Sequence, residues 1–537
     1  MKKISLLHPL WIERYKIGGI YDCSSNIILN VCKREYDLIH KGIANPSQIS
    51  NETLQLLSNF ARNNMLLDRQ NTKITPEDFI SNVVRYSKQR AIPRKLTLEL
   101  TEDCNLRCKY CRYTINESRK KGRYHNSSAL SYDSAVVAID NYLQSYKSII
   151  DTIPVQLIGL FIKRNPAVIG FYGGEVLLKK DLLMELISYS VSKAKELGIL
   201  SIRPFVTTNG TLLTSDIIKF FVDNNVYLSV SLDGPQCEND KNRVYKNGDG
   251  SFAQVYKSLK YIQHNYPEYY TSSITIQAVA APNYDTDNVN NFFLEMSKDN
   301  LYAGINSFIR LEFADYSEEE NFNISKTYNG WNDENYMDCV LDKCISICET
   351  IKEDSTYEEI IRVFLFNPEY LDVFRMAFTA NERIQNSPSV SDKCFNSCYI
   401  GKANQVLRAN GEFHLCERTD YSMPIGSIEK GLDETKVTNL YREYFSIMNR
   451  EECRNCWASK FCPICIGQLI KNSRIVAPTD FECNQIRSRY DLYLKILMIL
   501  AHKFSNVFNA LLRYFTKSND STIDEFYTYC IENNLIK

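Results

Sequence analysis

The sequence predicts an α/β protein with a small N-terminal α+β unit, a central partial barrel and a cysteine-rich C-terminal region. Strand-like and helical segments alternate between residues 94 and 316. Such alternation implies right-handed crossovers and a parallel sheet. Six units of this kind would form a partial (β/α)6 barrel of the TIM type or an open curved sheet. Cysteines dominate residues 391–485, where regular periodicity fades.

The composition is that of a globular protein. Its 537 residues are 44% hydrophobic and 24% charged, with a net charge of −1. Two to four domains are expected, with no general attraction to nucleic acid or anionic lipid. His8, Pro9 and Glu13 break the first apolar run, which makes a poor signal peptide. Residues 492–515 contain charges and indicate an amphipathic helix packed on the body. We therefore expect a cytoplasmic protein with no nucleic-acid partner and no membrane span.

Residues 1–75 are predicted to form a separate unit. Residues 13–32 indicate two short strands joined by a turn at 22–26. Helical spacing follows in residues 33–43 and 50–67. Such a unit would offer a sheet edge to a peptide or would act as a cap on the barrel, and the pattern leaves both alternatives open.

The polar residues 69–93 are expected to link this unit to the barrel. The predicted barrel strands are 95–101, 167–174, 201–208, 226–234, 273–281 and 305–313. Functional side chains should collect where these strands end. Residues 144–166 resemble an insertion, which would be a flap, a partner surface or a segment without function. Beyond the core at 94–316 we expect a helical connector at 317–390 and a helical tail at 486–537.

Eighteen cysteines are the unusual feature of the chain. In a long chain without a signal sequence, clustered cysteines more often bind metal than form disulfides. Cys104, Cys108 and Cys111 directly follow the first predicted strand, on a loop from which three thiolates can converge. A structural zinc site needs four ligands. Three thiolates suit a [4Fe–4S] cluster with one iron left open to a small molecule bound through nitrogen and oxygen.

With Tyr110 before the third cysteine, the pattern C-x-x-x-C-x-aromatic-C resembles that of the radical S-adenosylmethionine (SAM) enzymes. The resemblance implies that the open iron chelates the amino and carboxylate groups of SAM. One electron from the cluster then cleaves SAM to methionine and a 5′-deoxyadenosyl radical, which takes a hydrogen atom from the substrate. SAM would thus supply the missing fourth ligand.

Motifs at the ends of the next three predicted strands match the same family in order. Gly173 and Gly174 would let backbone approach a ligand closely, and the family uses the position of Glu175 to receive the methionine ammonium. The remaining implied SAM contacts are Asn209 after the third strand, Ser231 and Asp233 after the fourth, and Arg243 beyond it. Ser231 and Asp233 resemble ribose-side contacts. Arg243 would hold the SAM carboxylate, a task suited to a guanidinium.

The C-terminal cysteines resemble the SPASM domain, an extension with two auxiliary [4Fe–4S] clusters. The match is C-x(9–15)-G-x(4)-C and then C-x(2)-C-x(5)-C. The next spacing in this pattern is usually three residues, whereas two residues separate Cys462 from Cys465 here. The resemblance implies Cys394, Cys398, Cys416 and Cys465 as ligands of the first cluster and Cys453, Cys456, Cys462 and Cys483 as ligands of the second. Without Cys394 the first cluster would keep an open iron for a substrate thiolate. A zinc ribbon at 453–465 is the alternative.

Glu417 lies directly beside Cys416 and is a candidate general base or a solvent-facing charge. Family members with SPASM domains mostly modify peptides or proteins, because nearby clusters can accept an electron from the substrate radical. Residues 1–75 resemble the winged-helix-like domains that recognise precursor peptides of ribosomally made products. The resemblance implies a maturase with three [4Fe–4S] clusters and SAM. Its partners would be a precursor peptide, which acquires a thioether or other crosslink, and a reducing flavodoxin or ferredoxin.

Three alternatives remain at the level of sequence. An anaerobic sulfatase-maturating enzyme, which converts Cys or Ser to formylglycine, shares the barrel and the SPASM domain but normally lacks an N-terminal peptide-binding domain. A non-catalytic electron-transfer or scaffold protein would not cleave SAM. A zinc-bound interaction module would be distinguished by its metal content.

Overall fold

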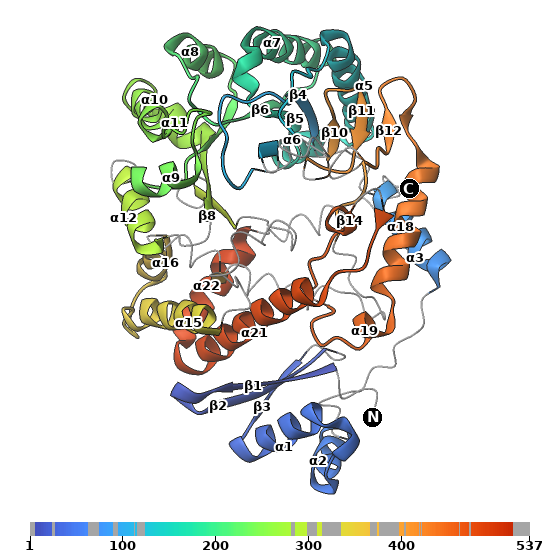
Figure 1. Cartoon of the computed structure of the whole chain (residues 1–537), viewed down its shortest axis with the longest axis vertical. Coiled ribbons are helices and arrows are strands. Elements are labelled where there is room, and N and C mark those ends of the chain that lie inside the picture. The colour runs from blue at the N-terminus through green and yellow to red at the C-terminus, as the bar shows by residue number, and fades with distance from the viewer. Residues whose placement is uncertain are drawn as a thin grey trace.

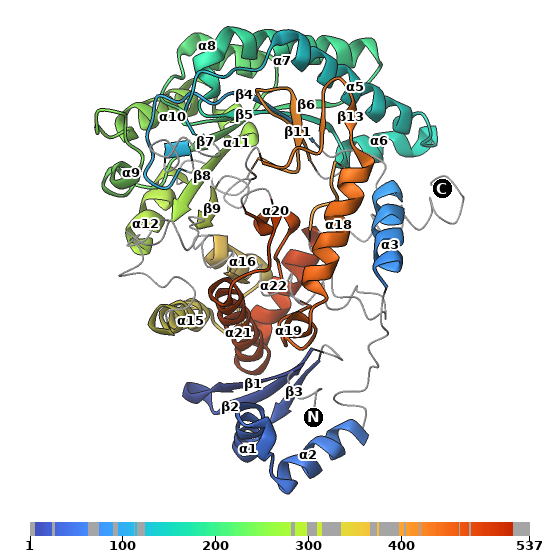
Figure 2. The same cartoon turned by 45° about the vertical axis from the view of Figure 1, so that its right-hand side comes forward.

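The computed structural model of the chain is shown in Figures 1 and 2. The described residues are 6–23, 27–62, 75–89, 95–111, 113–114, 124–280, 285–297, 309–313, 334–365, 373–374, 397–401, 404–417, 419, 422–460, 462–471 and 474–518. Within these ranges, no helix combines the length and apolarity needed to cross a membrane.

The N-terminal unit is a three-stranded antiparallel sheet followed by two helices. Its elements are β1 (Leu7–Ile12), β2 (Ile17–Asp22), β3 (Ile27–Val31), α1 (Lys33–Ala44) and α2 (Asn51–Arg62). β2 lies between β1 and β3. The predicted strands and helices of this unit are present, although residues 63–67 of the second predicted helix lie outside the described residues. Strand β1 was not predicted because its apolar run contains His8 and Pro9.

Both faces of this small sheet are covered. Leu7 and Ile20 pack with α1 and α2 in a separate cluster, whereas Leu10 and Tyr21 belong to the main core of the molecule. The opposite face rests on helix α21 (Asp480–Lys503), as both views show. The close approach is visible at Gly19, where a Cβ atom would lie 2.6 Å from the terminal methyl of Met498. The unit is therefore docked on the body of the protein.

Six parallel strands form the centre of the molecule. They are β4 (Leu96–Thr101), β5 (Ala167–Gly173), β6 (Ile202–Thr208), β7 (Tyr227–Ser231), β8 (Ile274–Ala280) and β9 (Ile309–Phe313). They are hydrogen-bonded in sequence order. The six predicted strands and the partial barrel are confirmed among the described residues, with boundaries shifted by at most three residues, while residues 281 and 305–308 of the predicted strands lie outside the described residues.

Helices cover the outer face of this sheet (Figure 1). They are α5 (Tyr132–Ile150), α6 (Val155–Arg164), α7 (Lys180–Glu196), α8 (Ser215–Asp223), α9 (Gln236–Asn242), α10 (Phe252–Asn265), α11 (Pro267–Ser273) and α12 (Thr286–Ser297). The suspected insertion at 144–166 forms the end of α5 and all of α6. Its Tyr146, Ile150 and Phe161 are buried in the main core. This segment is thus part of the helical layer and not a flap.

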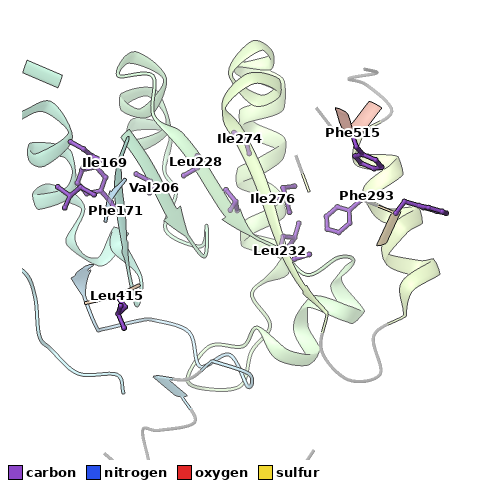
Figure 3. Close-up of a cluster of buried hydrophobic side chains, with 14 of the residues drawn as sticks. Ile169, Phe171, Val206, Leu228, Leu232, Ile274, Ile276, Phe293, Leu415 and Phe515 are labelled. Atoms are coloured by element: carbon purple, nitrogen blue, oxygen red, sulfur yellow. The ribbon is translucent and has the colours of Figure 1, made fainter. Parts of the chain in front are cut away.

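The strands have two faces of different character. Ile169, Phe171, Val206 and Leu228 point outward into the helical layer and are at most 1% exposed (Figure 3). The alternate residues line the inner face, where many side chains are only half-buried. Because successive side chains point to opposite faces of a strand, the buried outer row and the half-exposed inner row define which side faces the lumen.

The C-terminal region extends the barrel sheet at its β4 edge. β10 (Gln405–Leu407) pairs parallel with β4, and β11 (Glu412–His414), β12 (Gly426–Ser427) and β13 (Gly431–Leu432) continue from it as antiparallel strands. A fully buried ion pair between Arg408 and Glu99 crosses the junction at 2.9 Å. The hydroxyl of Tyr113 also donates to Glu99. The cysteine-rich region is therefore joined to the barrel by backbone pairing and by charge.

Helices make up most of the remaining described chain. They are α3 (Pro76–Gln89), α15 (Glu334–Glu349), α16 (Tyr357–Leu365), α18 (Glu434–Met448), α19 (Glu451–Arg454), α20 (Ile466–Leu469) and α22 (Ser505–Ser518), with a small hairpin of β14 (Ile470–Lys471) and β15 (Arg474–Ile475). Part of the expected linker, α3, packs on α18 through Phe79 and Phe445. The expected boundary at 485/486 falls inside α21. The single helix expected at 492–515 is two helices, α21 and α22, that meet at Phe504.

Candidate functional site

The first three cysteines lie on the loop after β4, at the carboxyl end of the barrel strands. Backbone bonds fix the loop: Arg107 N donates to Val244 O at 2.7 Å and Lys109 N to Asn242 O at 3.0 Å. The loop is therefore tied to the segment that ends α9, which follows the fourth strand of the barrel. Its three thiols lie near one another, since Cys108 and Cys111 both contribute to the raised pKa of Cys104.

These thiols are half-buried, and the Cys104 sulfur accepts hydrogen bonds. Burial, followed by the nearby Glu175 carboxylate, raises the pKa of Cys104. Burial raises the pKa of Cys108 to about 12, against the opposing effect of Arg243. The Leu106 amide donates to the Cys104 sulfur at 3.4 Å and the Asn209 side-chain amide donates at 3.8 Å. Such a pocket disfavours bare thiolates, whereas a cationic metal centre would stabilise them.

The Gly-Gly-Glu segment at the end of β5 packs against the start of the cysteine loop. A Cβ at Gly173 would meet Thr101 O at 2.2 Å, and one at Gly174 would meet Asp103 O at 2.1 Å. Gly173 also has a φ of +149°, which disfavours other residues. The close approach that these glycines permit is therefore to the base of the cysteine loop, a protein contact.

Glu175 joins the ends of β5 and β6. Its fully buried carboxylate accepts hydrogen bonds from Thr208 Oγ1 at 2.6 Å, Asn209 N at 2.7 Å and Leu177 N at 3.0 Å. Burial raises its pKa despite these three bonds. Glu175 thus fixes the backbone of Asn209, whose side chain donates to the Cys104 sulfur. Glu175 therefore acts on the cysteine loop through Asn209.

Tyr110, Asp233 and Arg243 form one network beside Cys108, in which Asp233 and Arg243 are buried and Tyr110 is half-buried. Asp233 accepts hydrogen bonds from Tyr110 Oη at 2.6 Å, from Arg243 Nε at 2.9 Å and from Val279 N at 3.0 Å. The Arg243 guanidinium carbon lies 5.5 Å from the centre of the Tyr110 ring. The structure therefore brings together three residues that were predicted separately from three motifs.

Two polar side chains at the cysteine loop, Asn105 and Thr211, were not predicted from the sequence. Asn105 accepts a hydrogen bond from the Asn209 side-chain amide at 2.9 Å and donates to Thr211 Oγ1 at 2.8 Å. Thr211 Oγ1 in turn donates to Asn209 Oδ1 at 2.7 Å. Asn105 lies between the predicted ligands Cys104 and Cys108, and this position was the signal in the sequence that could have identified it.

The predicted SAM contact Ser231 is the last residue of β7, where it lies on the inner face and is half-buried.

The ligands expected for the first auxiliary cluster converge in part. A Cβ at Gly467 would lie 3.6 Å from the Cys416 sulfur and 3.9 Å from the Cys465 sulfur, so these two thiols share one small region. Ser397, the neighbour of the exposed Cys398, accepts a hydrogen bond through Oγ from Ile466 N, beside Cys465, at 3.0 Å. The fourth expected ligand, Cys394, lies outside the described residues.

The second group of four expected ligands is brought together by separate elements. Cys453 lies on α19, Cys456 and Cys462 on the following loop, and Cys483 on the first turn of α21. Burial raises the pKa of Cys462 to about 12, and the other three thiols add to the rise. Arg450 Nε donates to the Cys453 sulfur at 3.4 Å.

Glu417 faces the barrel junction and not open solvent alone. It is half-buried, and it accepts a hydrogen bond from Asn404 Nδ2 at 2.7 Å. Asn404 also accepts one from Thr97 Oγ1, on β4, at 2.9 Å. The neighbouring Cys416 carbonyl accepts a hydrogen bond from Arg408 at 3.1 Å. The Cys416–Glu417 turn is therefore held from two sides by the β4–β10 junction.

The donor set of the first loop fits an iron–sulfur cluster. Three half-buried thiols, with N–H donors directed at one sulfur, match the thiolate ligation and sulfur hydrogen bonding that such clusters use. Within the described ranges, no three His, Cys, Asp or Glu side chains are gathered closely enough to hold a single metal ion.

Comparison with known proteins places the site in context. Residues 98–285 match the model of the Radical SAM superfamily. A serine-type anaerobic sulfatase-maturating enzyme of Bacteroides thetaiotaomicron is 30% identical over 160 residues, which are 30% of this chain and 34% of that relative. The chain thus spans about a third of that relative's length.

Two further similarities extend over more of the chain. The radical SAM cyclopropyl synthase TigE of Paramaledivibacter caminithermalis is 20% identical over 511 residues, covering 88% of this chain and 93% of TigE. The structure of native anSMEcpe with bound AdoMet superimposes with a TM-score of 0.50 at 17% identity. The superposition covers 78% of this chain and 98% of anSMEcpe, which shows that the two chains share a fold.

Proposed function

Because this chain is a radical SAM enzyme, with its superfamily domain at residues 98–285, we propose that it is a maturase of a ribosomally made precursor peptide. It would abstract a hydrogen atom from the peptide and form a thioether or another crosslink. A radical SAM enzyme requires SAM and a [4Fe–4S] cluster, and the loop after β4 offers the thiols for the cluster.

In this proposal the cysteines of the loop and the residues that follow β7 have different roles. Cys104, Cys108 and Cys111 would hold the cluster, which supplies, when bound, the electron that cleaves SAM to the hydrogen-abstracting radical. Asp233 orients Tyr110 and Arg243, and the guanidinium can present its remaining N–H groups to the SAM carboxylate. The buried setting of this network limits water around the reactive centre.

The N-terminal unit is the observation that supports a peptide substrate. It is docked on α21 and contacts Trp457 and Ser459, which follow Cys456, and β3 lies at an edge of the described sheet. An edge strand can pair with an extended peptide. The TigE similarity covers 88% of this chain, so it extends well beyond the superfamily domain. Two auxiliary clusters at the C-terminal cysteines would receive the electron that the substrate radical must lose.

A sulfatase-maturating activity is the second candidate. It is raised by the 30% identity to the serine-type enzyme, which is higher than the identity to TigE but covers 30% of this chain. The match spans 160 residues, which is shorter than the superfamily domain at residues 98–285. It therefore does not discriminate between the two substrate classes.

The test begins with anaerobic reconstitution, dithionite and SAM. We expect 5′-deoxyadenosine, which should disappear in Cys108→Ala. The second step is mass spectrometry of a short peptide encoded beside the gene after co-expression. Each crosslink removes two hydrogen atoms, whereas cysteine-to-formylglycine conversion also exchanges sulfur for oxygen. A sulfatase-derived peptide that is converted, with the adjacent peptide unchanged, would overturn the maturase proposal in favour of the second candidate.

A further inference from the structure

Arg450 brings a positive charge to a sulfur of the second group of cysteines. Its Nε donates to the Cys453 sulfur at 3.4 Å, and Cys453 is one of the four ligands proposed for the second auxiliary cluster. Arg450 directly precedes α19, and Cys453 is the third residue of that helix. The guanidinium thus reaches a sulfur three residues further along the chain, and the proposed function gives this contact no role.

The four thiols of this group suit an iron–sulfur cluster. Cys453, Cys456, Cys462 and Cys483 are all half-buried. They lie near one another, since burial raises the pKa of Cys462 and the other three thiols add to the rise. Four thiolates are the usual ligands of a [4Fe–4S] cluster, and hydrogen bonds to those sulfurs are one of the factors that set its reduction potential. A charged donor at Cys453 would therefore act directly on the cluster.

The charge of Arg450 is only weakly compensated. Its side chain is 29% exposed, so the contact with the sulfur is partly shielded from water. The carboxylate of Glu452 lies 3.8 Å from the same Nε atom, but that side chain is 77% exposed. An ion pair this long and this exposed contributes little. The hydrogen bond to the sulfur is therefore the shorter and better shielded of the two contacts.

A second arginine lies beside the same group of thiols. Arg487 follows Cys483 by one turn of α21, so the two side chains share a face of the helix. Burial raises the pKa of Cys483, and the Arg487 guanidinium is the largest opposing influence. The intervening carboxylate of this region, Glu482, accepts a hydrogen bond from Thr479 N at 2.8 Å in the cap of α21. Cations from two separate elements thus face the second group.

The first cysteine loop has a different electrostatic environment. The hydrogen bonds to the Cys104 sulfur come from neutral amides. Burial and then the Glu175 carboxylate raise the pKa of Cys104. Arg243, the cation near this loop, is paired with the buried Asp233 at 2.9 Å. Because positive charge and hydrogen bonds at the sulfurs favour the reduced, more negative form of a cluster, the second group should give its cluster the higher potential.

We propose that Arg450 raises the reduction potential of the second auxiliary cluster, so that the electron lost by the substrate radical flows toward this cluster. This inference deepens the proposed function and rests on it. Arg450 acts through the Cys453 sulfur and touches no reacting atom, so it is a positioning residue. Reduction adds one electron to the cluster, and the N–H bond and the positive charge both stabilise that added charge.

The experiment is a redox titration of the anaerobically reconstituted full-length enzyme, followed by electron paramagnetic resonance. The signal that is missing from Cys462→Ala belongs to the second cluster. In Arg450→Met the ratio of reduced to oxidised second cluster should fall about tenfold at a given potential, which is a shift of about 59 mV to lower potential for one electron. Arg450→Gln, which keeps an N–H donor without the charge, should give a smaller fall. Arg450→Lys, which keeps the charge, should restore most of the wild-type value.

Arg454→Met is the matched control. It removes the same charge from the same helix, but Arg454 is exposed, and its side chain donates to no sulfur among the described residues. The midpoint potential should therefore change much less than in Arg450→Met. A midpoint that does not move in Arg450→Met, or that falls equally in Arg454→Met, would overturn the inference.

Iron analysis separates this inference from the proposed function. Cys462→Ala should lose about four irons, whereas the three Arg450 variants should keep them. If Cys462→Ala loses no iron, the second cluster is absent, and the proposed electron path falls together with this inference. If it loses the iron but the Arg450→Met midpoint is unchanged, this inference alone is refuted. Should Arg450→Met itself lose iron, equal midpoints in Arg450→Gln and Arg450→Lys would refute the inference, because only the lysine keeps the charge.

Discussion

The two cysteine regions of this molecule are organised in opposite ways. Cys104, Cys108 and Cys111 lie within eight consecutive residues on one loop, which the barrel strands hold in place. The group that ends at Cys483 is spread over 31 residues, from Cys453 on α19 to the first turn of α21. The first site is therefore a local structure on a rigid sheet, while the second exists only when distant elements have packed together.

The second region also carries the N-terminal unit. His8, on β1, stacks on Trp457 with ring centres 3.7 Å apart, and Trp457 lies between Cys456 and Cys462. Cys23, just after β2, lies 3.3 Å from Ser459 Oγ. Helix α21, which begins with Cys483, supplies the rest of the contact surface. Order at the second cysteine group and docking of the N-terminal unit should therefore depend on each other, whereas the first loop should be independent of both.

The largest effect is expected from Cys108→Ala, which tests the independence of the first loop. It should abolish 5′-deoxyadenosine formation and remove about four irons, because a cluster with two protein thiolates left is poorly held. Iron at the C-terminal cysteines and hydrogen exchange at β1 and β2 should not change. Metal analysis and exchange mass spectrometry measure both. Faster exchange in the N-terminal sheet would contradict the proposed separation of the two regions.

Cys462→Ala tests the second region and should affect the N-terminal unit. Loss of this proposed ligand should loosen the loop that carries Trp457, so amide exchange in β1 and β2 should rise by about tenfold, equivalent to about 1.4 kcal/mol of local opening. Cys465→Ala is the matched control, because it removes a thiol of the Cys416 group, away from the N-terminal unit. Equal exchange in the two variants would show that docking does not depend on the second group.

The contrast also explains what could be predicted from sequence. The cysteine loop and the six strands follow from local patterns, since strand and helix alternation fixes where loops meet. Strand β1 was missed because Pro9 and His8 interrupt its apolar pattern, and its stability comes from packing on α21. The roles of Asn105 and Thr211 could not be predicted either. Their bonds join segments that are 106 residues apart, and no spacing rule encodes such contacts.

Arg408→Met should destabilise the junction that joins the cysteine-rich region to the barrel. It leaves Glu99 buried without its cation, which typically costs about 3–5 kcal/mol. Chemical denaturation of the reconstituted protein measures the change in the free energy of unfolding. The double variant Glu99→Gln with Arg408→Met should recover part of the loss, because it removes the uncompensated charge. A double variant as unstable as the sum of both single variants would show that the pair is not coupled.

The smallest effect is expected at Asp491, through which α21 binds the N-terminal unit. Burial raises its pKa, but the hydrogen bond from His8 at 2.7 Å and the Lys495 ammonium at 2.8 Å outweigh this, and the net pKa is lowered. A carboxyl group whose pKa is lowered by folding stabilises the folded state above its unfolded pKa of about 3.9. That stabilisation is lost as the pH falls through the lower folded value. Asp491→Asn should therefore cost about 1–2 kcal/mol between about pH 5 and 8, and the cost should shrink below about pH 4. Denaturation of wild type and variant across this range decides the sign, and a difference that grows in acid would show that the carboxylate does not stabilise the docked unit.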